Sequence, residues 1–439
     1  MSMPKYPEYE DSGVPWVGAI PSEWDVQPLM GVASERRESN KGLEEDNLLS
    51  LSYGRIVQKN MASNDGLLPE SFETYQVVHP DDIVFRLTDL QNDKRSLRTA
   101  PVSQKGIITS AYLAVVPRLI NSRYFAYLLR SYDLTKVFYS MGGGLRQSMK
   151  YSDVKRLPVL VPSVREQMAI ANFLDRETAR IDALIAEQEK LLVLLAEKRQ
   201  ATISHAVTRG LDPNVPMKDS GIAWLGEVPA QWEVGPLKHW VVFKSGGTPS
   251  KERVDYWGGD IPWASAKDLK TELLMDTIDH LAPEAVEDGA ATTLPAGVVL
   301  VVVRGMILAR MFPVSLALVP MAINQDLKGL LPKQGLEAEY LAWLLRGTAD
   351  QSLQRLDEAG HGTKALRMDA WASMELPVPP VDEQRQIANF LAQRIEALDE
   401  LSREARAAID LLRERRSSLI SAAVTGQIDV RNVVVGRVA

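Results

Sequence analysis

The sequence predicts a mixed α/β (α+β) protein in which two similar globular domains are joined by two long antiparallel coiled-coil helices, as a pseudo-two-fold repeat. The strongest observation is a doubled helix start: residues 166–174 read EQMAIANFL, and residues 383–391 read EQRQIANFL. Each copy opens a long amphipathic segment, and each is preceded by a region rich in short β-forming runs. Self-similarity at this scale is the mark of an internal duplication.

Shorter motifs repeat in the same order along the chain. Residues 11–18 (DSGVPWVG) return at 219–226 as DSGIAWLG, and residues 124–130 (YFAYLLR) return at 340–346 as YLAWLLR. Residues 166–212 then match the segment that starts at Glu383 without a gap, with 20 identities in 47 positions. Three collinear matches indicate that one unit of short motif, variable region and helix occurs twice.

The variable regions contain the short apolar runs that are typical of strands. They include residues 48–52 and 81–85 in the first half, and 261–264 and 297–303 in the second. The segments at Tyr124 and Tyr340 have helical periodicity. Each region is therefore expected to form a mixed α/β domain of ~130–140 residues, a usual domain size.

The two repeated helices carry apolar residues at heptad spacing, which predicts pairing. The expected pairing residues are Ile170, Leu174, Ile181, Leu184, Leu191 and Leu195 in the first helix, and Ile387, Leu391, Leu398, Leu401, Leu412 and Leu419 in the second. A helix of about 40 residues spans roughly 60 Å and cannot bury such a stripe against itself. The other copy is the partner that the sequence offers, and the alternative is that each helix packs on its own globular domain. An antiparallel pair would carry one domain at each end.

The repeats give boundaries for the whole chain. We expect a first globular domain over residues 1–162, a first long helix over 163–210 and a second globular domain over 211–380. The second long helix is expected over 381–425, followed by a C-terminal tail over 426–439.

Composition limits the classes of function. The chain has no cysteine, which excludes disulfides, thiol nucleophiles and Cys-ligated zinc. Neither a phosphate-binding Gly-Lys-Ser/Thr loop nor a closely spaced histidine pair occurs, so we expect no catalytic residue and no metal site. The apolar stretch 298–323 is broken by Arg304, Arg310 and two prolines, which favours core strands over a membrane span. Without a signal-peptide pattern, the expected location is the cytoplasm, with no membrane contact.

Local charge leaves room for nucleic-acid binding despite a net charge of −7. Residues 25–160 carry 18 Lys/Arg against 15 Asp/Glu, whereas residues 233–375 carry 14 against 19. Arg and Lys bind phosphates, and Arg also reads guanine edges. The candidate DNA-binding residues are Tyr53, Arg55, Lys59, Lys94, Arg95, Arg98, Arg146 and Lys150 in the first half, and Lys244, Thr248, Ser250, Lys251, Arg253, Lys267, Arg304, Lys364 and Arg367 in the second. The competing interpretation of each cation is a solvated surface charge, and the recurring tryptophans at 16, 24, 224 and 232 are expected to be framework packing.

With these motifs in view, the chain resembles the specificity subunits of type I restriction–modification systems. The resemblance rests on the paired tryptophan motifs, on residues 247–263 (GTP…YWGGDIPW), on residues 324–328 (NQDLK), and on the doubled helix start. It covers essentially the whole length, although the first half lacks the Gly-Thr-Pro run.

The resemblance implies that each globular region is a target recognition domain that reads one half of a bipartite site in double-stranded DNA. The paired helices would set the spacer and dock two DNA methyltransferase subunits, which flip adenines out of the duplex and use S-adenosylmethionine. Two restriction subunits with ATP and Mg would join where they are present, and no cofactor would bind this chain. Two alternatives remain open: a DNA-binding regulator without methyltransferase partners, and a coiled-coil scaffold that binds only protein.

Overall fold

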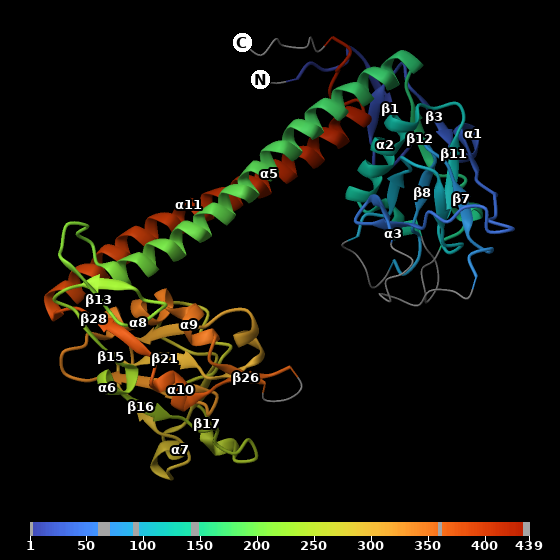
Figure 1. Cartoon of the computed structure of the whole chain (residues 1–439). Helices are drawn as coiled ribbons and strands as arrows, with labels where there is room; N and C mark the ends of the chain where they lie inside the picture. The colour runs from blue at the N-terminus through green and yellow to red at the C-terminus, as the bar shows by residue number, and fades with distance from the viewer. Residues whose placement is uncertain (1–2, 60–70, 91–95, 142–148, 359–361, 433–439) are drawn as a thin grey trace. The chain divides into compact units, whose positions relative to one another are not determined.

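A computed structural model describes residues 3–59, 71–90, 96–141, 149–358 and 362–432. The chain forms two compact units (Figure 1). The first comprises Met1–Glu189 and Ala407–Ala439, and the second comprises Lys190–Arg406. Each unit holds one globular domain together with a stretch of both long helices.

The first globular domain is built on a four-stranded antiparallel sheet. Its strand order is β4 (Ala33–Glu35), β11 (Leu113–Pro117), β8 (Ile83–Phe85) and β9 (Thr99–Pro101). Two-stranded ladders join β1 (Tyr9–Asp11) to β2 (Ala19–Pro21), β3 (Asp25–Pro28) to β12 (Pro158–Val161), β5 (Leu49–Ser52) to β6 (Arg55–Gln58), and β7 (Gln76–Val78) to β10 (Gly106–Ile108). The helices are α1 (Leu29–Val32), α2 (Ser122–Leu134), α3 (Val137–Met141) and α4 (Tyr151–Val154). The predicted helix at Tyr124 is α2, whose buried residues join the apolar core beside this sheet.

The second globular domain has the same central layout with more strands around it. Its main sheet runs β16 (Val241–Ser245), β25 (Leu327–Pro332), β21 (Val299–Val302), β23 (Val314–Ala317) and β18 (Leu273–Leu274). A second sheet contains β19 (Asp279–Leu281), β17 (Trp257–Ala264), β24 (Met321–Ile323) and β20 (Thr293–Leu294), and a third contains β22 (Arg304–Gly305), β27 (Lys364–Leu366) and β26 (Leu356–Glu358). The remaining pairs are β13 (Met217–Asp219) with β14 (Glu227–Pro229) and β15 (Glu233–Pro236) with β28 (Glu375–Val378). The helices are α6 (Leu237–Trp240), α7 (Pro283–Glu287), α8 (Ala338–Gly347), α9 (Ala349–Leu353) and α10 (Met368–Ala372), with 3-10 turns at Val254–Tyr256 and Met306–Ala309.

The two long helices are α5 (Val164–Arg209) and α11 (Val381–Val424), and they lie side by side in opposite directions (Figure 1). In the first unit Arg416 of α11 pairs with Asp182 of α5, at 2.9 Å between Nε and Oδ1. In the second unit Arg199 of α5 pairs with Asp399 of α11, at 3.2 Å. Asp182 and Asp399 are equivalent positions of the repeat, 217 residues apart, and so are Arg199 and Arg416. The two ion pairs are therefore the same contact made once in each unit. The predicted fold class, with its antiparallel helical pair and pseudo-two-fold repeat, is confirmed.

The predicted helix seam needs correction at three positions. Leu184, Leu191 and Leu401 are 40%, 41% and 48% exposed. The less exposed positions of α5 alternate by three and four residues through Ile181, Ile185, Gln188, Leu192 and Leu195. The prediction chose the wrong leucine in Leu191–Leu192, because two adjacent apolar residues fit the spacing equally well. Among the remaining pairing residues, Leu412 and Leu419 are partly buried, and the others are buried as predicted: Ile170, Leu174, Ile181, Leu195, Ile387, Leu391 and Leu398.

The repeated tryptophan motif packs where a long helix ends. In the second unit Trp232 is fully buried, and it lies against Gly210, the residue that follows α5. In the first unit Trp24 packs in the same way against Gly426, two residues after the end of α11. Both glycines have positive φ, +77° and +73°, as the left-handed residue after a helix requires. The expected framework role of these tryptophans is therefore correct. In the part of the chain that the structure describes, no helix is long and apolar enough to cross a membrane.

Candidate nucleic-acid interface

A buried glutamine in each repeated helix start fixes the long helix to its globular domain. The Gln167 side chain donates to Pro162 O at 2.8 Å and accepts from the backbone N–H of Asn121, the residue that caps α2, at 2.7 Å. Gln384 makes the same contacts in the second unit, with Pro379 O and with the N–H of Glu337 before α8. The Glu-Gln of the repeated motif thus orients the domain's own helix against the long helix.

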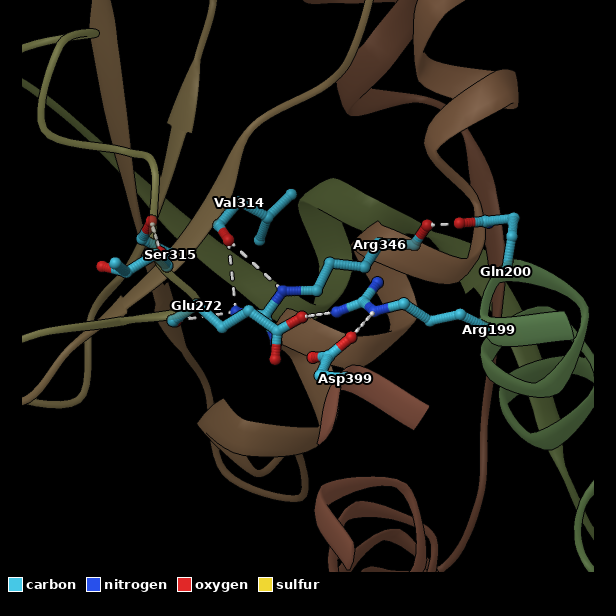
Figure 2. Close-up of polar contacts among 8 residues, drawn as sticks. Arg199, Gln200, Glu272, Val314, Ser315, Arg346 and Asp399 are labelled. Carbon is cyan, nitrogen blue, oxygen red and sulfur yellow. Dashed lines mark hydrogen bonds and ion pairs between the residues drawn. The ribbon is translucent and has the colours of Figure 1, made fainter. Parts of the chain in front are cut away.

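An arginine at the end of each repeated Tyr-to-Arg motif holds the outer segments of the sheet together. In the second domain the Arg346 guanidinium donates to Glu272 O at 2.7 Å and to Val314 O at 3.1 Å (Figure 2). In the first domain Arg130 donates to Gly54 O and to Thr99 O. Thr99 and Val314 begin β9 and β23, so the contacts of Arg130 and Arg346 are equivalent. We call these two residues the clamp arginines and each set of contacts a clamp. Burial lowers the pKa of Arg346 to about 10 and also lowers that of Arg130.

The second clamp is also connected to both long helices. The Glu272 carboxylate pairs with Arg199 of α5 and lies 3.8 Å from the Arg346 guanidinium, while Arg199 also pairs with Asp399 of α11 (Figure 2). Gln200 adds a hydrogen bond to Arg346 O at 3.2 Å. These contacts are within the second unit and fix its globular domain to its stretch of both helices.

The Gly-Thr-Pro run forms a supported surface loop in the second domain. Gly247 N–H donates to Ile323 O at 3.0 Å, and a Cβ at Gly246 would collide with that same backbone carbonyl. The indole N–H groups of Trp263 and Trp257 donate to Gly247 O at 3.0 Å and to Ser250 O at 3.2 Å. These two tryptophans therefore hold the loop by hydrogen bonds to its backbone, and they leave Thr248, Ser250 and Lys251 exposed.

Several predicted cations of the second domain already have acidic partners. Ion pairs join Arg253 to Asp255, Lys267 to Asp279, Lys364 to Glu358 and Arg367 to Asp357. Lys244, Lys251 and Arg304 are exposed and make no ion pair with any described residue. The β22–β27 ladder sets Arg304 opposite Ala365 and Gly305 opposite Lys364, and so brings Arg304 and Lys364 together. Exposed acids beside a cation weaken its attraction for phosphate, so the three cations without an ion pair are the better candidates.

The first domain presents a different set of candidate DNA-binding residues. Tyr53 is 74% exposed at the tip of the β5–β6 hairpin, and Arg55 and Lys59 follow it on the exposed side. Lys150 is exposed before α4. Arg98 was predicted to contact DNA, and the structure contradicts this: it is fully buried and donates to Tyr139 Oη at 3.1 Å and to Thr88 O at 3.1 Å. Its position in a basic run hid this core role. The predicted residues Lys94, Arg95 and Arg146 lie outside the described residues.

Metal-ligating side chains do not gather anywhere within the described ranges. No group of three or more His, Asp or Glu residues there could hold a metal ion. What the two domains offer chemically is hydrogen-bonding and cationic surface on loops that a rigid framework positions.

Comparison with known proteins gives one consistent result. The model of the type I restriction modification DNA specificity domain matches residues 229–411. A specificity subunit of a type I restriction enzyme from Escherichia coli is 28% identical over 261 residues, which are 58% of this chain and 59% of that protein. The MjaIX specificity subunit of Methanocaldococcus jannaschii is 31% identical over 38% of this chain and 39% of its own length. The chain is similar to the specificity subunits of type I restriction–modification systems.

A solved structure extends the likeness of fold to almost the whole chain. A chain from a study of complex assembly and conformational transition in a type I restriction–modification system has a TM-score of 0.70. It is 16% identical and covers 92% of this chain and 98% of its own. At this level of identity the likeness shows the shared architecture alone. The sequence matches to the two relatives named above span 59% and 39% of those proteins.

Sequence reasoning missed three polar residues of the two domains. Gln325 is exposed and accepts a hydrogen bond from the Thr248 hydroxyl, which places an amide beside the Gly-Thr-Pro loop. Arg355 lies next to Arg367, and burial, then repulsion from Arg367, lowers its pKa. Arg130 was visible only as the last residue of a repeated helix. The recurrence of that arginine at 346 was the available signal.

Proposed function

We propose that this chain is the DNA-recognition subunit of a type I restriction–modification complex, in which each globular domain contacts one half of a bipartite site. The observation that carries the proposal is the duplication itself: two domains of one layout, each fixed to the start of a long helix by the same glutamine contacts and held together internally by an equivalent arginine. We take residues 1–162 and 211–380 as the two target recognition domains. The exposed cations and loop hydroxyls are the proposed contacts to phosphates and base edges.

The helical pair also has an apolar face that suits methyltransferase subunits. In the first unit Leu184 of α5 and Leu411 of α11 are 40% and 66% exposed. In the second unit Leu401 of α11 and Leu194 of α5 are 48% and 50% exposed. Leu401 is the repeat counterpart of Leu184, and Leu411 is the repeat counterpart of Leu194, at the same offset of 217 residues. Each unit therefore presents an equivalent pair of exposed leucines. Exposed apolar residues at repeat-equivalent positions favour two equal docking faces, and hence two methyltransferase subunits per chain.

The chemistry of the complex then belongs to the partner subunits. The methyltransferases would hold S-adenosylmethionine and methylate an adenine in each half-site, and restriction subunits would bring ATP hydrolysis with Mg. This chain would contribute recognition and spacing.

The spacing function can be tested by lengthening both helices. Insertion of one heptad after Leu192 and one after Ser402 keeps the three-four alternation and adds about 10 Å to the pair. At about 3.4 Å per base pair, the spacer should grow by roughly three base pairs while both half-sites keep their sequence. Methylome sequencing of a host that carries the variant complex measures both. An unchanged spacer would exclude the helices as the ruler.

A further inference from the structure

The first unit contains a cavity of about 870 Å³ between its globular domain and its stretch of the long helices. The β5–β6 hairpin contributes Tyr53, Gly54 and Arg55 to its lining, α2 contributes Arg130, and the helical pair contributes Asp182 and Arg416. The equivalent place in the second unit is occupied by the Glu272 carboxylate, which lies between Arg199 and Arg346. Arg416 and Arg130 are the repeat counterparts of those two arginines.

The first domain cannot supply the missing carboxylate from the equivalent position. Gly54 corresponds to Glu272, because the carbonyls of both accept from the clamp arginine and both residues immediately precede the strand beside β9 or β23. Gly54 has a φ of +74°, and a Cβ there would collide with the Arg130 guanidinium. The next residue, Arg55, adds a third cation in place of an acid.

The acids around the cavity are already engaged. Asp175 pairs with Arg123 at 2.6 Å, Glu189 with Arg413 at 3.2 Å, and Asp81 accepts from Ser122 Oγ at 2.7 Å.

Asp182 pairs with Arg416: its Oδ1 lies 2.9 Å from the Arg416 Nε, and its Oδ2 accepts from Nη2 at 3.3 Å. Arg55 and Arg130 have no ion pair with a described residue. Burial is the main cause that lowers the pKa of Arg130, the nearby Asp133 carboxylate raises it, and repulsion from Arg416 and Arg55 lowers it further. Arg55, Arg130 and Arg416 all line the cavity.

We propose that this cavity binds a phosphate group of the DNA backbone between Arg55, Arg130 and Arg416, in the place that the Glu272 carboxylate takes in the second domain. The inference rests on the proposed function and adds a contact to it. Guanidinium groups match phosphate oxygens in fork geometry, and the volume accommodates a phosphate with its solvent. The hairpin that forms the rim also carries Tyr53 and Lys59, both exposed. A bound phosphate would bridge Arg55 and Arg130 of the first domain to Arg416 of the helical pair. In the second domain the Glu272 side chain makes the corresponding bridge to Arg199.

The first test uses inorganic phosphate as the probe on the purified full chain. Phosphate at about ten times its Kd should raise the Tm by about 3 °C relative to chloride at equal ionic strength. Arg55→Gln and Arg416→Gln should abolish this rise. Lys59→Gln is the matched control, because Lys59 lies on the same hairpin outside the cavity lining, and it should keep the rise. No rise in the wild type, or a rise that survives in Arg55→Gln, overturns the site.

The second test asks whether DNA supplies the phosphate, and uses the complex with its methyltransferase subunits. Inorganic phosphate, compared with chloride at equal ionic strength, should weaken binding of the split DNA site to the wild type and to Lys59→Gln. Arg55→Gln should show no such competition, and its slope of log K against log salt should fall by about 1. Phosphate protection without competition overturns the DNA assignment and points to a free anion or a partner's carboxylate. Failure of the wild-type complex to bind DNA at all would instead refute the proposed function.

Discussion

The two globular domains hold the same clamp arginine in opposite charge settings. Arg346 lies beside Glu272, which also pairs with Arg199 of α5. Arg130 lies beside Gly54 and faces a cavity in which Arg416 is the counterpart of Arg199. Both halves of the repeat therefore keep the clamp arginine, but only the second half has an acidic residue, Glu272, at the equivalent position beside it. The second junction is closed by the protein's own carboxylate, and the first is left open to an external anion.

This difference suggests a division of labour within the repeat. Residues that fix a domain to its helix recur in both halves, as Gln167 and Gln384 do. Residues that face the solvent or a ligand diverge, as Gly54 and Glu272 do. Recurrence between halves thus marks framework, and divergence at a recurrent framework site marks a place where the halves meet different partners.

The largest effect should come from removal of the clamp arginines. Arg346→Met leaves two carbonyls unpaired and takes a cation from Glu272, so it should destabilise the second domain by about 3 kcal/mol. Arg130→Met loses only its carbonyl contacts and should cost the first domain about 2 kcal/mol. Hydrogen exchange of β23 amides in one variant and β9 amides in the other measures the two costs. A larger loss for Arg130→Met would contradict the proposed difference between the junctions.

A smaller effect is expected from Glu272→Ala, because this side chain is 35% exposed and its ion pairs are partly screened. The variant should lose about 1 kcal/mol of stability. It should also make the second unit gain protection from inorganic phosphate, since Arg199 and Arg346 then face an unfilled space. Phosphate-dependent hydrogen exchange around β18 is the measurement. If phosphate protects wild type and variant alike, the carboxylate is not what distinguishes the two junctions.

The smallest effect on stability should come from the exposed leucines of the helical pair. Leu184→Glu should change the free energy of unfolding by less than about 0.5 kcal/mol, whereas Ile185→Glu at the seam should cost about 2 kcal/mol or more. In native mass spectrometry Leu184→Glu should nonetheless reduce bound methyltransferase subunits from two to one. Leu401→Glu, its repeat counterpart, should do the same at the other face. Retention of both subunits by the double variant would disprove this docking face.

The fold was predictable because the sequence contains internal repeats and heptad spacing of apolar residues. The doubled helix start and the tryptophan motifs predicted two domains and a helical pair, and the comparisons confirm the family that those motifs indicated. The seam was misplaced at Leu184 and Leu191, because the adjacent Ile185 and Leu192 satisfy the same spacing, and it was misplaced at Leu401, the repeat counterpart of Leu184.

The candidate site was less accessible from the sequence. Whether a cation is buried, as Arg98 is, or already paired, as Lys267 is, depends on residues distant in the chain. The cavity beside Arg130 is open because Gly54 stands at the position that Glu272 takes in the other half. That equivalence can be recognised only when both folds are compared. Repeats therefore revealed the framework, and three-dimensional structure was needed to separate framework cations from free ones.

We propose that each globular domain reads its half of the DNA site independently of the other. The most direct measurement replaces residues 25–160 with the corresponding domain of another specificity subunit and determines the methylated motif by methylome sequencing. We predict that one half-site changes while the other half-site and the spacer stay as in the wild type. A change in both half-sites, or in neither, would contradict the account.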